Sequence, residues 1–100
     1  MPYEIDSYEN RRAGQRYDYP AAIEYSLETS DGAETIHRAV TINISMSGFA
    51  AYLFARHAAG ESIVIKSQLP GGKSRAVVRW IKRENEGIFL AGLKFCNEAI

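Results

Sequence analysis

The sequence predicts a small all-β protein, an antiparallel barrel or sandwich of six short strands. Short apolar segments recur along the chain, and clusters of glycine, proline, serine and acidic residues separate them. One hundred residues, 46% of them hydrophobic and 11% aromatic, are enough for one domain with one core. A six-stranded barrel is the favoured arrangement, because closure removes the exposed strand edges that invite aggregation.

The elements follow one another in a simple order. Residues 1–19 are polar and without a steady period, so they are expected to form an N-terminal arm that leads to the barrel, residues 20–100. Residues 55–61 are compatible with one helical turn that ends at Gly60. No helix of stable length is expected at the C-terminal end, where five residues follow the last strand. The predicted strands comprise residues 21–28, 35–45, 48–54, 62–69, 75–83 and 88–95.

Side chains alternate between the two faces of a strand, so the sequence predicts which residues point inward. In the second strand, the core face is predicted to hold Val40, Ile42 and Ile44, and the outer face a polar stripe of Thr41, Asn43 and Ser45. In the fifth strand, Trp80 is in phase with Ala76 and Val78, which favours packing in the core or at the barrel mouth; base stacking is the alternative. Met46 and Cys96 are interpreted as packing residues.

Composition excludes several classes of function. Twelve basic and twelve acidic residues cancel, which argues against a general footprint for duplex nucleic acid. A single cysteine, Cys96, allows neither an intrachain disulfide nor a cysteine zinc cluster, and His37 and His57 have no other metal-ligand types nearby in the sequence. No metal site, cofactor or catalytic residue set is expected, and therefore no enzyme. The first ten residues are acidic and lack an apolar run, so the expectation is a cytoplasmic domain without a signal peptide or membrane segment.

Positive charge is concentrated in the predicted arm. Arg11, Arg12 and Arg16 lie within six positions, and Gly14 permits tight backbone geometry between them. Guanidinium groups bind phosphate and the O6/N7 edge of guanine bidentately, so the cluster indicates a local anion site. The alternative is a solvated basic patch that pairs with neighbouring carboxylates.

A second candidate site lies in the segment NISMSG, residues 43–48. Asn43 and Ser45 are polar on an otherwise apolar strand, and together they offer the donors and acceptors that read a base edge. Gly48 allows a bend of the backbone or the close approach of a ligand. The alternative is a strand end followed by a bulge or turn.

The two segments together resemble the PilZ domain family. RAGQR fits the pattern R-x-x-x-R, NISMSG fits [D/N]-x-S-x-x-G, and VVRW and GIFLAGLKF are similar to the last two strands of that family. The resemblance covers residues 11–95 and implies a receptor for cyclic di-GMP, the bacterial second messenger. By position it implies that Arg12 and Arg16 contact phosphates and guanine edges, with Arg11 as a further candidate for a phosphate or a second ligand molecule.

The same resemblance implies that Asn43 and Ser45 hydrogen-bond a guanine and that Gly48 allows close approach. Asn43 stands where the family often has Asp, and one carbonyl acceptor in place of a carboxylate predicts weaker binding. The sequence therefore predicts a cyclic di-GMP receptor whose arm becomes ordered over the ligand and alters the binding of a protein partner. The alternatives are a PilZ-like interaction module that binds no nucleotide, and a small barrel for single-stranded nucleic acid, which the zero net charge disfavours.

Overall fold

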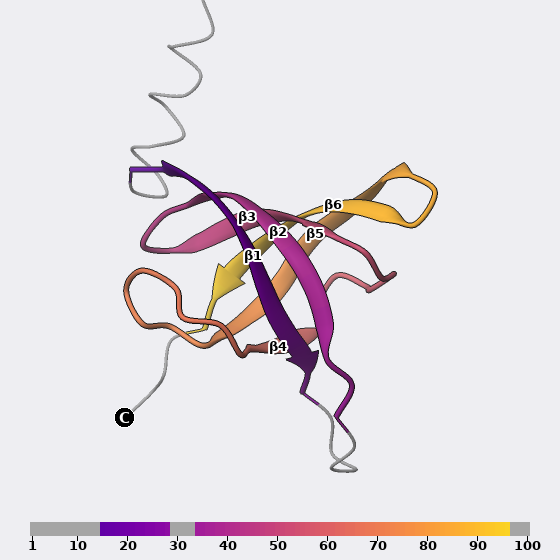
Figure 1. Ribbon diagram of the computed structural model, residues 1–100, viewed down its shortest axis with the longest axis horizontal. Helices are drawn as coiled ribbons and strands as arrows, with labels where there is room; N and C mark the ends of the chain where they lie inside the picture. Colours follow the sequence, from indigo (N-terminus) through magenta and orange to yellow (C-terminus); the bar gives the residue numbers. More distant parts are fainter. Residues whose placement is uncertain (1–14, 29–33, 97–100) are drawn as a thin grey trace, which may run out of the picture.

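The computed structural model describes residues 15–28 and 34–96, which form a barrel of six antiparallel strands (Figure 1). The strand order around the barrel is β1-β2-β3-β6-β5-β4, and β4 closes the ring by pairing with β1. The predicted fold class is confirmed. The strands are β1 (Tyr17–Leu27), β2 (His37–Ile44), β3 (Gly48–Leu53), β4 (Ser62–Ile65), β5 (Arg75–Asn85) and β6 (Ile88–Phe95).

Strand boundaries differ most from the predicted ones at β1 and β4. β1 begins at Tyr17, four residues before the predicted start, and β4 ends at Ile65 because the chain then turns toward Pro70. Residues 55–61 do not form the predicted helical turn. They form a loop that ends in a tight turn, where the amide of Glu61 donates to the carbonyl of Ala58 (3.2 Å). No helix within residues 15–28 and 34–96 has the length and apolarity that crossing a bilayer requires.

The inward face of β2 differs from the prediction. Thr41 is buried, with 1% of its surface exposed, whereas Val40 is 36% exposed on the outside. The reason is a β-bulge between Thr41 and Asn43, which inserts one residue opposite β3 and reverses the alternation. Ile44 lies beyond the bulge and is buried as predicted, while Ile42 is half-buried at the bulge itself.

Thr41 is tolerated in the core because its hydroxyl is satisfied. It donates to the carbonyl oxygen of Tyr19 and accepts from the amide of Ala21 (3.0 Å). These two backbone groups belong to a second bulge, in β1 between Asp18 and Ala21, where the ladder with β2 is interrupted. A buried polar side chain thus replaces the backbone hydrogen bonds that the bulge removes.

Candidate functional site

A hollow of about 520 Å³ lies on the outer surface of the barrel, beside the turn that joins β2 to β3. Three of the residues predicted to bind a ligand line it: Arg16, Ser45 and Gly48. Residues of β5 and β6 complete the lining, because β6 pairs with β3 and β5 pairs with β6. The hollow therefore collects side chains from both halves of the sequence.

The β2–β3 turn is fixed by its own hydrogen bonds. The amide of Ser45 donates to the carbonyl of Gly48 (2.8 Å), and the Ser45 hydroxyl accepts from the amide of Ser47 (3.2 Å). The carbonyl of Ser47 in turn accepts from the amide of Phe95 on β6 (2.8 Å). The hydroxyl of Ser45 also lies 3.2 Å from that of Ser47, so part of its hydrogen-bonding capacity is used by the turn, as in serine turns generally.

Gly48 is required by the packing of two strands. It pairs with Lys94 of β6, and a Cβ at position 48 would stand 3.1 Å from both the carbonyl carbon of Leu93 and the Cα of Lys94. It would come still closer to the carbonyl oxygen of Leu93. Both neighbours are backbone, so a side chain at this position would push β3 and β6 apart. In the free protein, the segment that closely approaches Gly48 is β6, and the close approach of a ligand stays a prediction.

Trp80 lies on the outside of the barrel, with 48% of its surface exposed, and the predicted core or mouth position is wrong. A bulge between Val78 and Trp80 reverses the alternation of β5, so that Ile81 packs on the core instead. The indole lies over Gly92 of β6, where a Cβ would stand 2.8 Å from its Cζ2 atom. Trp80 lines the hollow and offers it an aromatic face of the kind on which bases stack.

Two further cations in the lining of the hollow favour an anionic ligand. Arg79 and Lys94 are exposed and line it, and neither forms an ion pair with a carboxylate among the described residues. Together with Arg16 they give the hollow that Trp80 lines three positively charged side chains. Because the chain has no net charge, this concentration is local and fits a small anion better than a long polymer.

Of the remaining predicted site residues, the structure describes only Asn43. Asn43 is half-buried on β2 and pairs with Ala50 of β3, which does line the hollow, so Asn43 is one strand away from its edge. Arg11 and Arg12 lie outside the described residues. The prediction for these three residues stays a prediction.

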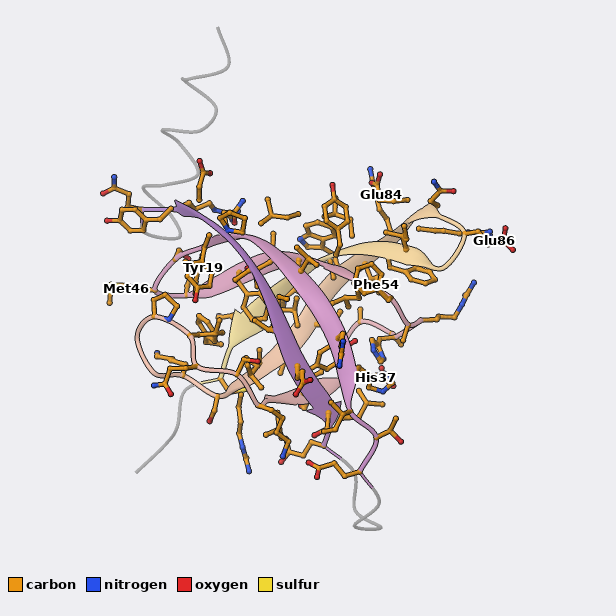
Figure 2. The ribbon with its side chains drawn as sticks, viewed as in Figure 1. Tyr19, His37, Met46, Phe54, Glu84 and Glu86 are labelled. Atoms are coloured by element: carbon orange, nitrogen blue, oxygen red, sulfur yellow. The ribbon has the colours of Figure 1, made fainter. Side chains whose placement is uncertain are left out.

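Met46, at the tip of the β2–β3 turn, is 86% exposed, so its interpretation as a packing residue is wrong (Figure 2). Ser47 and Lys94 were not predicted, because their place depends on the pairing of β3 with β6. The glycines in both strands carry the only local signal for it, since glycine within a strand often marks a close approach of another chain segment.

The two histidines, of which His57 is buried and His37 half-buried, form a separate cluster, and they are not isolated as the sequence suggested. The hydroxyl of Tyr25 is hydrogen-bonded to Nε2 of His57 (2.6 Å), Glu61 lies 3.5 Å from Nδ1 of the same ring, and His37 stacks on Tyr25. Burial raises the pKa of Tyr25 to about 12, with a smaller contribution from Glu61. Burial also lowers the pKa of His57, with His37 adding to the effect and Glu61 opposing it.

No group of three histidine, cysteine or carboxylate side chains within the described ranges is arranged to hold a metal ion. The cluster is held instead by hydrogen bonds and ring contacts, which join β1, β2 and the 55–61 loop. It lies apart from the hollow, with which it shares no lining residue.

Comparison with known proteins gives one finding. The family model of the PilZ domain matches residues 10–99, nearly the whole chain. The match includes both arginine positions of the R-x-x-x-R pattern and the whole of the segment 43–48. A search of curated proteins found no match.

Proposed function

The chain belongs to the PilZ domain family, and we propose that it is a receptor for cyclic di-GMP that binds the nucleotide in the hollow beside the β2–β3 turn. PilZ domains are, as a family, binding domains for this second messenger rather than catalysts. The observation that carries the proposal is the position of Trp80: its exposed indole lines the same hollow as three cations, on the outer face of β5.

The hollow offers the groups that a cyclic dinucleotide needs. The two phosphates of the nucleotide carry two negative charges, which Arg16, Arg79 and Lys94 can neutralise. The flat face of a guanine suits the indole of Trp80. A volume of about 520 Å³ lies within the range of small-molecule sites.

In the proposed mechanism, phosphate binding draws the arginines of the arm onto the hollow. Arg16 directly precedes β1, so its engagement fixes the direction in which the chain enters the barrel. Arg12 adds a second guanidinium, and Asn43 accepts a hydrogen bond from the guanine edge with its single carbonyl oxygen. Ordering the arm changes the surface beside the hollow and favours one state of partner binding.

Calorimetric titration of cyclic di-GMP into the purified chain tests this proposal, with GTP and cyclic GMP as controls for selectivity. Arg79→Ala is expected to weaken binding roughly tenfold or more, the effect of losing one hydrogen bond to a charged group. Arg83→Ala is the matched control, since Arg83 is exposed on the same strand but does not line the hollow. No heat of binding from a folded chain would contradict the proposal and favour an interaction module without a ligand. An equal loss in both variants would contradict the proposed site.

A further inference from the structure

A second hollow, of about 580 Å³, adjoins the first at the β2–β3 turn. Its lining includes Val77 and Phe95 from β5 and β6, Met46 from the turn, and Lys73 from the loop between β4 and β5. The floor is apolar, because Phe95 is buried and Val77 is half-buried. The exposed side chain of Met46 adds a flexible apolar edge.

The two hollows share three residues: Ser47, Arg79 and Lys94. The pairing of Lys94 with both Gly48 and Val77 accounts for this, since it places Lys94 between β3 and β5 at the boundary of the hollows. Trp80, in contrast, lines only the first hollow, and Lys73 lines only the second. Trp80 and Lys73 therefore distinguish the two hollows, while the cations Arg79 and Lys94 are common to both.

The second hollow combines positive charge with an apolar floor. The ammonium group of Lys73 stands 6.0 Å from the centre of the Phe95 ring, within the range of a cation–π contact. Like Arg79 and Lys94, Lys73 forms no ion pair with a carboxylate in the described part of the chain. The three cations and the apolar floor together favour a ligand that carries several negative charges with apolar side chains between them.

We propose that the second hollow binds an acidic segment of a partner protein, and that cyclic di-GMP and this segment compete for Arg79 and Lys94. Carboxylates spaced along a peptide match cations spread over two strands and a loop, and apolar side chains of the same peptide match the floor. A nucleic acid fits less well, because the chain has no net charge with which to hold a long polyanion. The competition rests on the proposed function; the docking of the acidic segment does not.

Competition at shared cations supplies a direct route from ligand to partner. When phosphates occupy Arg79 and Lys94, the acidic segment loses two of its three charge contacts and keeps only that to Lys73. Because coupling between two binding events is reciprocal, the segment must weaken nucleotide binding by the same factor by which the nucleotide weakens the segment. The signal then requires no change in the barrel itself.

The test uses a fluorescein-labelled peptide with the sequence Glu-Glu-Leu-Glu-Glu-Leu, whose binding to the full chain is followed by fluorescence anisotropy at low salt. Lys73→Glu is expected to weaken peptide binding about tenfold or more while leaving nucleotide binding within about twofold. Trp80→Ala is expected to do the reverse, and Arg79→Ala to weaken both. Arg83→Glu is the control, because it makes the same change of net charge at an exposed position that lines neither hollow. Added cyclic di-GMP should displace the peptide from the unmodified chain.

Several results would overturn the proposal. The docking site is refuted if the peptide does not bind the unmodified chain, or if Lys73→Glu weakens the peptide no more than Arg83→Glu does. It is also refuted if two nucleotides bind per chain and Lys73→Glu removes one of them, since the second hollow is then a nucleotide site. If the peptide results are as expected but no nucleotide binds, the docking site stands, while the competition and the proposed function both fail.

Discussion

Gly48 and Gly92, two buried glycines in the strands beside the hollow, are expected to differ in the stability that is lost when each is replaced by alanine. At position 48 the added Cβ would meet only backbone, with the Leu93 carbonyl carbon and the Lys94 Cα both at 3.1 Å and the Leu93 carbonyl oxygen closer still. Overpacking of this kind costs about 1–3 kcal/mol. At position 92 the new Cβ would meet the indole of Trp80, which is half-exposed and free to turn outward.

Gly48→Ala is therefore expected to lower the free energy of unfolding by about 2 kcal/mol, which corresponds to a fall in Tm of roughly 8–16 °C for a chain of this size. Gly92→Ala is expected to lower it by less than about 1 kcal/mol, because only an exposed side chain must move. The second variant should instead shift the emission of Trp80, the one tryptophan in the sequence.

Thermal unfolding followed by circular dichroism gives the stability of each variant, and the emission spectrum reports the position of the indole. Gly48→Ala with unchanged Tm would refute the packing of β3 against β6 at this position. A large stability loss in Gly92→Ala without a spectral shift would refute the placement of Trp80 over Gly92. The comparison also decides what the motif glycine does, since a glycine needed only by the ligand would leave the stability of the free protein unchanged.

Three further outcomes are expected. Trp80→Ala should weaken cyclic di-GMP binding about 5- to 150-fold, the loss of about 1–3 kcal/mol of stacking, while Trp80→Phe keeps most of the affinity in the same titration. Thr41→Val should destabilise the chain by about 1–3 kcal/mol in urea unfolding, because two backbone groups of β1 lose their partner, whereas the exposed Thr35→Val should leave stability unchanged. The pKa of His57 is lowered from 6.5 in the fold, so the unfolded chain takes up a proton more readily. Stability is then full above pH 6.5 and falls as the pH drops below it, and His57→Gln should remove this slope from unfolding curves measured between pH 7 and pH 5.

Much of the fold is contained in local sequence patterns. Segments of alternating apolar residues between turn residues located six strands, and the last strand has the predicted bounds, residues 88–95. Ring closure was expected because open edges are unfavourable, and β1 pairs with β4 accordingly. The positions of the strands depend on residues that are close together in the sequence, so they can be predicted from the sequence alone.

The bulges in β2 and β5 are the main reason for the errors. Each inserts one residue into a strand and breaks the simple alternation along it, so that Thr41 lies inward and Trp80 outward, contrary to the predicted period. No residue type marks either bulge, since each is an irregularity in the pairing with a neighbouring strand, of β2 with β3 and of β5 with β6. Such contacts are non-local, so the period of one strand does not reveal them.

Only the part of the candidate site that comes from the first half of the sequence was predictable. Arg16, Ser45 and Gly48 belong to short patterns that a reader can recognise, and the structure brings them to one hollow. Lys94 joins them because β6 lies beside β3, although the two strands are separated by more than thirty residues in the sequence. The site thus depends on strand order as much as on the motifs.

The central claim is that cyclic di-GMP binds against Trp80 in the first hollow. The indole N–H of the only tryptophan gives a single, well-separated peak in a nitrogen–proton correlation spectrum, and titration with cyclic di-GMP follows it directly. The account predicts a saturable shift of this peak together with the amide peaks of Ser47, Gly48 and Lys94, and no shift with GTP at the same concentration. Binding that leaves the indole peak in place, while peaks elsewhere on the barrel move, would contradict the claim.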